Sequence, residues 1–160
     1  MDDSRPVVTV KRSTDALAIH TPGDVTYLGH IRELVCDLAH KVGFPSEDIA
    51  KIEMAVDEAC SNIVEHAYAP DTNWRWQHQR PEIRLVVRIA QDQLIIEIND
   101  HGQQFDFAAY RPTNVHDRAQ AMHTGGYGIA IMREFMDEVA YISNAAEGNT
   151  LRLVKYLKKT

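Results

Sequence analysis

The sequence predicts an α+β fold formed by a single domain over residues 1–160. In some segments apolar residues recur every three or four positions, as on the buried face of a helix. In others they alternate with polar residues, as in a strand. The chain is 160 residues long and 44% hydrophobic, which is enough to bury one core and little more.

The first predicted elements are a short hairpin and a helix. β-Branched and apolar residues at 7–11 and 15–20 predict two short strands. Asp24 then offers an N-cap, and Gly43 followed by Pro45 supplies a stop signal. Between them, the apolar residues at helical spacing are Leu28, Ile31, Val35, Leu38 and Val42.

A second helix is predicted from Ser46, its expected N-cap, to about Tyr68. Glu47 and Asp48 would lie in its first turn, where carboxylates interact favourably with the helix dipole. The residues expected on its buried stripe are Ile49, Ile52, Val56, Ala59 and Ile63.

The second half of the chain predicts strands around one more helix. Alternating apolar residues over 83–89 and 94–98 indicate two adjacent antiparallel strands. Residues 101–124 are polar without clear periodicity, a length typical of a functional lid. A third helix is expected from about Gly126 to Asp137, followed by strands at 138–144 and 150–157.

The charge balance argues against a nucleic-acid-binding protein. The sequence has 17 Lys and Arg against 23 Asp and Glu, a formal net charge of −6, whereas such proteins use surplus basic residues against phosphates. Cys36 and Cys60 lie in apolar helical stretches and give no support for a disulfide framework. No apolar run approaches the roughly 20 residues that span a bilayer, and the acidic start does not resemble a signal peptide. We therefore expect a cytoplasmic protein without membrane or direct nucleic-acid partners.

Two polar residues of the second predicted helix, Glu58 and Asn62, are four positions apart and so share a face. Both are expected to project away from Val56 and Ile63. Asn62 offers Mg²⁺ a neutral oxygen, and Glu58 can take a proton from an attacking hydroxyl. Taken alone, the pair is also explained by the exposed face of an amphipathic helix.

The predicted strand that ends near Asp100 becomes polar over its last residues, as suits a ligand site. The Asp100 carboxylate can accept a hydrogen bond from an adenine amino group, and Gly102 lets the backbone approach the base closely. Asp and Gly are also ordinary turn residues, so a plain turn explains this segment taken alone.

A glycine-rich segment, Thr124-Gly125-Gly126-Tyr127-Gly128, opens the third predicted helix. It resembles neither a P-loop nor a dinucleotide-binding fingerprint. Glycines let backbone N–H groups converge on a phosphate, and the helix N-terminus adds a favourable dipole. A flexible hinge explains the glycines equally well.

Together, these segments resemble the boxes of the GHKL-type ATPases in order and approximate spacing: Glu58-x3-Asn62, Asp100-x-Gly102-x2-Phe105-Asp106 and Gly125-Gly126-x-Gly128. The amino-acid sequence of residues 56–68 and of 136–139 is most similar to the serine-protein kinase branch, whose members act as bacterial anti-sigma factors. The resemblance covers roughly the whole chain. It implies a two-layer α/β sandwich, in which three helices cover a mixed, mostly antiparallel sheet and residues 101–124 form a mobile lid over the nucleotide.

The resemblance also implies roles for individual residues, with ATP and Mg²⁺ as cofactors. Asn62 would coordinate Mg²⁺, Glu58 would be the general base toward a substrate serine, and Asp100 would recognise adenine. Gly102 would line the base pocket. The remaining nucleotide-binding residues that it implies are Phe105, Gly125, Gly126, Gly128 and Thr150, the last within Gly148-Asn149-Thr150.

Kinases of this branch phosphorylate a serine on a small STAS-type anti-sigma factor antagonist, and many sequester a sigma factor as homodimers. The resemblance therefore implies a serine/threonine-protein kinase that regulates transcription. The alternative is a non-catalytic ATP-binding module that sequesters a protein partner. A module of that kind is expected to lack the base or the Mg²⁺ ligand, whereas this sequence has both Glu58 and Asn62. Simple ATP hydrolysis, with Glu58 activating water, is a further alternative.

Two regions are candidates for partner contacts. The exposed face of the first helix includes Arg32 and Glu33, which suit a dimer or sigma-factor contact or a merely solvated charged face. Residues 73–80 interleave Trp74 and Trp76 with basic residues, which favours an interface hot spot or a loop folded on its own aromatics. Stacking on nucleic-acid bases is a third option, which the net negative charge disfavours. The eight histidines are scattered without metal-ligand spacing.

Overall fold

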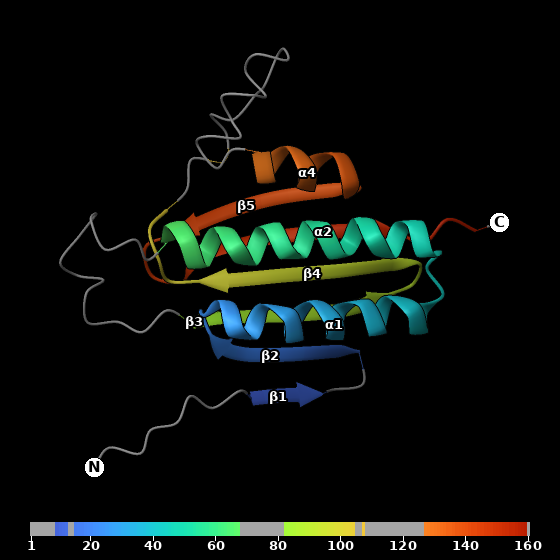
Figure 1. Cartoon of the computed structure of the whole chain (residues 1–160), viewed down its shortest axis with the longest axis horizontal. Helices are drawn as coiled ribbons and strands as arrows, with labels where there is room; N and C mark the ends of the chain where they lie inside the picture. The colour runs from blue at the N-terminus through green and yellow to red at the C-terminus, as the bar shows by residue number, and fades with distance from the viewer. Residues whose placement is uncertain (1–8, 13–14, 68–81, 105–106, 108–126, 160) are drawn as a thin grey trace.

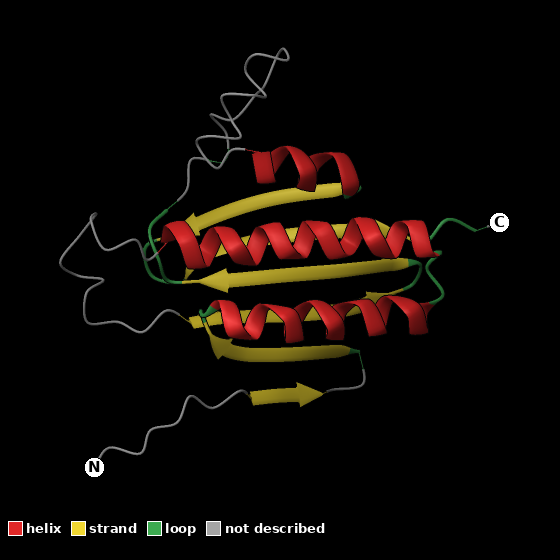
Figure 2. Ribbon diagram, viewed as in Figure 1, coloured by secondary structure: helices red, strands yellow, loops and turns green. Residues whose placement is uncertain are grey.

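The structure is a computed structural model that describes residues 9–12, 15–67, 82–104, 107 and 127–159. Its three described α-helices lie on one face of a β-sheet, so that the molecule has two layers (Figure 2). The α+β sandwich expected from the sequence is confirmed. The elements follow in the order β1 (Thr9–Arg12), β2 (Ala16–Pro22), α1 (Val25–Val42), α2 (Ser46–Asn62), the π-helical turn η1 (Ile63–Ala67), β3 (Glu82–Ala90), β4 (Gln93–Asp100), α4 (Tyr127–Phe135), β5 (Glu138–Asn144) and β6 (Gly148–Tyr156).

The described strands form a six-stranded sheet in the order β1-β2-β3-β4-β6-β5. All five neighbouring pairs are antiparallel, including the predicted β3–β4 pair, whereas a mixed sheet was expected. β6 lies between β4 and β5. Because β4 and β6 are antiparallel, the start of β6 pairs with the end of β4. Asp100 is the partner of Asn149 in this register, and Asn99 is the partner of Thr150.

α1 begins and ends where the sequence predicts. Asp24 is its N-cap, and Asp24 Oδ1 accepts a hydrogen bond from Thr26 N over 2.8 Å. Gly43 ends the helix with a φ of 99°, a left-handed conformation that favours glycine. The Gly43 N–H bonds to the carbonyls of Ala39 and His40, which satisfies two groups at the helix end.

The start of α2 differs from the prediction. Ser46 is the first helical residue rather than the N-cap, and Pro45 occupies the cap with no side-chain hydrogen bond. Proline suits the entry to a helix because its ring fixes φ and its missing N–H would have no helical partner there. Glu47 and Asp48 lie in the first turn, as predicted.

The buried stripe of α2 is confirmed, and the helix changes type at its end. Ile49, Ile52, Val56, Ala59 and Ile63 are all buried. After Asn62 the backbone continues as the π-helical turn η1. Turns of this kind often occur at functional sites. The predicted helix end near Tyr68 lies outside the described residues.

The core lies between the helices and the sheet. Alternating side chains of the central strands, such as Leu85, Ile96 and Leu153, are fully buried. Ile129 and Met132 of α4 join them from the helical layer. Burial of each such side chain contributes about 1.5–3 kcal/mol, and the alternation fixes which face of every strand meets the helices.

Some predictions concern residues that the structure does not describe. Residues 101–104 and 107 of the expected lid are described, but the rest of it and the insertion at 73–80 are not. Cys36 and Cys60 are both free thiols. Within the described ranges, no helix combines the length and the apolar character needed to cross a membrane.

Candidate functional site

The described residues of the three sequence boxes lie at one end of the molecule. Figure 1 shows the C-terminal end of α2, the arrowheads of β4 and β5 and the start of α4 at the same end, on the left of the view. Asn62 ends α2, Asp100 ends β4, and Gly128 is in the first turn of α4. Residues far apart in the sequence are therefore gathered at one end of the sandwich.

Glu58 and Asn62 point at the first turn of α4. A β-carbon placed on Gly128 would lie 2.6 Å from Glu58 Oε2 and 3.1 Å from Asn62 Nδ2. Both side chains are half-buried, whereas the apolar stripe of α2 is buried. The two residues thus share a face outside the stripe, and that face meets the glycine-rich start of α4.

The environment of Glu58 makes its carboxylate more basic. Burial raises the pKa of Glu58 above its usual value, and the neighbouring carboxylates of Asp57 and Glu65 raise it further. Asp57 is itself bound by Arg32, whose Nη1 donates to Asp57 Oδ1 over 3.0 Å. A carboxylate with a raised pKa is well suited to accept a proton.

Asp100 is a buried carboxylate at the end of β4, with 6% of its surface exposed. Its Oδ1 accepts hydrogen bonds from Gly102 N over 2.7 Å and from Asn149 Nδ2 over 3.1 Å. Burial raises the pKa of Asp100, while these two hydrogen bonds and the nearby His101 lower it. A buried carboxylate at a strand end, held by its own backbone turn, is typical of a ligand-recognition residue.

Asn149, which the sequence analysis did not single out, completes this arrangement. It is 3% exposed, and its Nδ2 donates to both Asp100 Oδ1 and the Gly102 carbonyl, the latter over 3.0 Å. A signal for it existed in the sequence: Asn149 alternates with Leu151 and Leu153, so it belongs to the face of β6 that meets the helices.

Thr150 is not brought to Asp100. Successive side chains of a strand point to opposite faces, so Thr150 lies on the other face of the sheet from Asn149. Its Oγ1 accepts a hydrogen bond from Asn99 Nδ2 over 3.1 Å. Asn149, and not Thr150, is therefore the residue of β6 whose side chain contacts Asp100.

The structure describes only some of the remaining predicted site residues. Gly102 and Gly128 lie at the site, whereas Phe105, Gly125 and Gly126 are outside the described residues.

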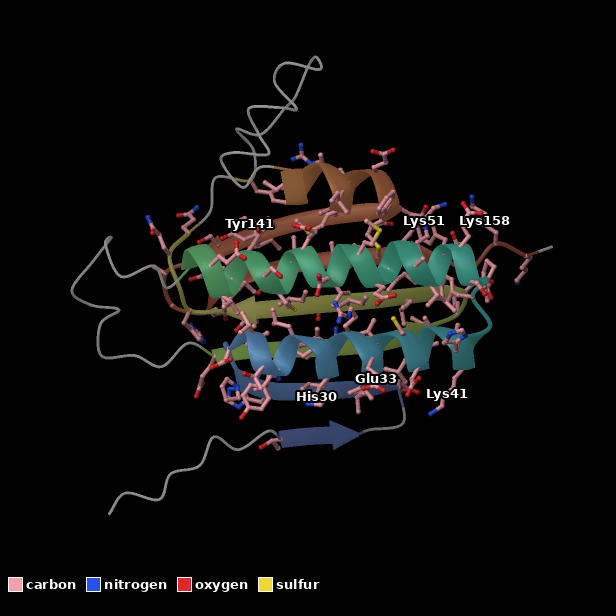
Figure 3. All side chains as sticks on the ribbon, in the orientation of Figure 1. His30, Glu33, Lys41, Lys51, Tyr141 and Lys158 are labelled. Atoms are coloured by element: carbon pink, nitrogen blue, oxygen red, sulfur yellow. The ribbon has the colours of Figure 1, made fainter. Side chains whose placement is uncertain are left out.

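A groove of about 540 Å³ runs along α1, and none of the site residues above lines it. Arg32, Glu33 and Asp37 of α1 line it, together with Glu53 of α2. Arg32 is half-buried, and its Nε lies 3.4 Å from Glu53 Oε1. Figure 3 shows Glu33 projecting from the side of α1 that is away from α2.

The fold and the site together define the class of protein. The chain belongs to the family described as "Histidine kinase-like ATPase domain", whose profile matches residues 21–155. The matched segment runs from the end of β2 almost to the end of β6, and so it includes the whole site. The GHKL resemblance is confirmed, and membership implies the use of ATP.

The relatives narrow the class to serine-protein kinases. The chain is 31% identical to the serine-protein kinase RsbW of Bacillus licheniformis over 157 residues, which cover 94% of this chain and 91% of the relative. It is 30% identical to RsbW of Bacillus subtilis over 155 residues, or 92% of this chain and 89% of the relative. Among solved structures, the RsbU and RsbW domains of Rv1364c from Mycobacterium tuberculosis match with a TM-score of 0.62 and 21% identity, covering 94% of this chain and 34% of that chain. The structural match supports the fold.

Proposed function

We propose that this chain is an ATP-dependent serine-protein kinase that acts as an anti-sigma factor. It transfers the γ-phosphoryl group of ATP to a serine of a STAS-type anti-sigma factor antagonist and also binds a sigma factor. One observation carries the proposal: Glu58, Asn62 and Gly128 meet at the end of the molecule where Asp100 closes β4. Phosphoryl transfer depends mainly on positioned groups of these kinds.

Glu58 is the proposed general base. Its carboxylate takes the proton of the substrate serine as the serine oxygen bonds to the γ-phosphorus. The bond between the γ-phosphorus and the β–γ bridging oxygen breaks, and ADP leaves with that electron pair. The raised pKa of Glu58 supports this role, because it strengthens the carboxylate as a base.

Asn62 is the proposed Mg²⁺ ligand. Its amide oxygen is a neutral, hard donor, and its side chain lies beside the first turn of α4, where the phosphates are expected. The described residues contain no cluster of three His, Cys, Asp or Glu side chains that could hold a metal ion. Phosphate oxygens and waters would complete the coordination, as is usual for Mg²⁺. When bound, the ion would neutralise part of the phosphate charge.

Asp100 is the proposed adenine-recognition residue, and Gly102 lines the base pocket. Asp100 Oδ2 has no hydrogen bond to any described residue, so it can accept one from an amino group. Phe105, Gly125 and Gly126 keep their predicted roles as nucleotide-binding residues.

The groove along α1 is the proposed partner surface. The carboxylates of Glu33, Asp37 and Glu53 outnumber the one arginine, Arg32, in its described lining. This charge suits a basic segment of a protein partner, whether sigma factor, antagonist or second copy in a homodimer. We place the protein in the cytoplasm, where such partners act.

Calorimetry of ATP binding with and without Mg²⁺ tests the proposal, followed by transfer from γ-labelled ATP to a purified STAS-type antagonist. Glu58→Gln should leave ATP affinity within about twofold of wild type and reduce transfer by about 10²–10⁴-fold. Asn62→Ala should severely weaken Mg²⁺-dependent binding. Glu134→Gln changes an exposed carboxylate of α4 and is the matched control, which should alter neither quantity.

The outcomes separate the candidate functions. Mg²⁺-dependent binding followed by transfer supports the kinase. Binding without transfer to any tested antagonist favours the non-catalytic module. Unchanged Mg²⁺-ATP affinity in Asn62→Ala removes the metal assignment.

A further inference from the structure

We propose that Asn149, held in place by Ser143, is a positioning residue that turns the Asp100 carboxylate so that one oxygen is presented to the amino group of a purine base. The inference rests on the proposed ATP site and goes beyond it by naming how adenine is selected. It also assigns functions to Asn149 and Ser143, neither of which was among the predicted site residues.

The two oxygens of Asp100 have different environments. Oδ1 accepts from Gly102 N over 2.7 Å and from Asn149 Nδ2 over 3.1 Å, so both of its lone pairs are used. Oδ2 has no hydrogen bond to the described part of the chain. Asp100 is 6% exposed, and a buried acceptor without a donor is costly, so a ligand that donates to Oδ2 would be favoured. Oδ2 is therefore the oxygen that a ligand would meet.

The amide of Asn149 can hold only one orientation. Nδ2 uses both of its hydrogens, on Asp100 Oδ1 and on the Gly102 carbonyl over 3.0 Å. The amide oxygen accepts from Ser143 Oγ over 2.8 Å. A flipped amide would place its oxygen against two acceptors and its nitrogen against the hydroxyl. Ser143 thus fixes the direction of the amide, and the amide fixes the carboxylate.

This arrangement selects a base by its hydrogen-bonding groups. The 6-amino group of adenine donates, and so it can pair with the ionised Oδ2 of Asp100. Hypoxanthine carries a carbonyl oxygen at that position, which the carboxylate repels. If Asp100 could rotate, a backbone or water donor could occupy Oδ2 and this discrimination would weaken. Asn149 prevents that rotation by holding Oδ1 with Gly102.

The test compares binding of ATP and ITP by calorimetry between pH 5 and pH 8. Asn149→Ala should weaken ATP binding about tenfold and reduce the preference for ATP over ITP by a similar factor. It should also move the acid loss of ATP binding to higher pH. Burial raises the pKa of Asp100, and the hydrogen bonds from Gly102 and Asn149 and the nearby His101 lower it. Removing the Asn149 hydrogen bond takes away one of these lowering effects, so the pKa of Asp100 should rise.

Ser143 supplies a second variant that is safe for the fold, because its side chain is exposed. Ser143→Ala should change affinity, preference and pH profile in the same direction as Asn149→Ala but by a smaller factor. Ser143→Thr keeps the hydroxyl and should restore all three to wild-type values. A purely structural role would lower thermal stability without moving the ATP preference or the pH profile.

Two results would overturn the proposal. One is an Asn149→Ala protein that binds ATP and ITP with wild-type affinities and pH profile. The other is an Asp100 carboxyl that titrates identically in ligand-free wild-type and Asn149→Ala proteins by NMR. The NMR titration needs no nucleotide, so it separates this proposal from the proposed function. If the wild-type chain bound no nucleotide, the proposed function would fail and the titration would still decide whether Asn149 controls Asp100.

Discussion

A methyl group on Gly128 would lie 2.6 Å from Oε2 of Glu58, closer than β-carbons approach other atoms in proteins. Gly128 is buried in the first turn of α4, and a side chain at this position would occupy the space that the Glu58 carboxylate now fills. From the sequence, the glycines could serve either to let the backbone approach a phosphate closely or to form a flexible hinge. The structure adds a third reason for Gly128, which is that its missing side chain leaves room for the carboxylate of Glu58.

Gly128→Ala should therefore impair catalysis more than stability. Oε2 is the end of a flexible side chain, so Glu58 should move aside instead of the helices separating. A displaced base of this kind should slow phosphoryl transfer by about 10- to 100-fold in single-turnover assays. Thermal denaturation should show only a small change. Transfer at the wild-type rate would mean that this contact does not set the position of Glu58.

Gly29→Ala is the matched control for that experiment. Gly29 lies within α1, and a β-carbon there would meet nothing within 4 Å. Alanine favours a helix over glycine by about 1 kcal/mol, so Gly29→Ala should raise the free energy of unfolding, and it serves as the control for stability because Gly29 lines the groove along α1.

The raised pKa of Glu58 predicts an unusual acid limb in the rate of transfer. Only the ionised carboxylate accepts the serine proton, so the rate should fall as pH drops through the Glu58 pKa. Burial and the neighbouring carboxylates raise that pKa, so the fall should begin above the pH expected for an exposed glutamate, whose pKa is about 4.3. Asp57→Asn removes one neighbouring charge and should move the limb to lower pH in single-turnover profiles. A limb that stays in place in Asp57→Asn would contradict this account of Glu58.

Asp100 predicts an opposition between binding and stability. Burial raises its pKa, so between the unfolded and folded pKa values the folded state binds more protons. Stability on this account falls as pH rises through that window, and the cost persists at neutral pH. Asp100→Asn removes the charge and keeps an oxygen to accept from Gly102. It should raise the melting temperature at neutral pH and weaken ATP binding at least about tenfold. A lower melting temperature at neutral pH would contradict the sign argued here.

The helices and strands could be predicted because their signals are local. The cap at Asp24, the left-handed stop at Gly43 and the stripe of α2 all depend on residues within a few turns of one another. Ser46 misled the prediction for a local reason too, since Pro45 and Ser46 are both good residues for a helix start and the sequence does not show which is the cap.

The sequence motifs alone do not determine which residues contact one another in the site. Whether Asn149 or Thr150 meets Asp100 depends on the register of β4 and β6, because a shift of one residue exchanges the two faces of a strand. The box order pointed to Thr150, whereas the alternation with Leu151 favours Asn149. Likewise, no spacing shows that Gly128 packs against Glu58, since that contact joins two helices distant in the sequence.

Phe107 follows β4 in the sequence and contacts residues of β5 and α4. Its ring stacks on Tyr141 of β5, with centroids 5.8 Å apart, and the guanidinium of Arg133 lies 4.7 Å from its centroid. Arg133 Nη2 also donates to the Phe107 carbonyl over 3.1 Å. Since Asp100 and α4 both belong to the proposed ATP site, this contact helps to hold the two sides of the site in place.

Arg133→Met should loosen that connection while it preserves much of the length and apolar character of the side chain. Loss of the cation–π contact and of one hydrogen bond should lower the free energy of unfolding by about 1–2 kcal/mol in urea denaturation. Amide hydrogen exchange at residue 107 should rise more than exchange in the core strands, because the lost contacts are local. Glu134→Gln, which changes the adjacent exposed residue of α4, should affect neither quantity. Uniformly faster exchange throughout the sheet would instead mean that Arg133 supports the whole fold and has no specific hold on Phe107.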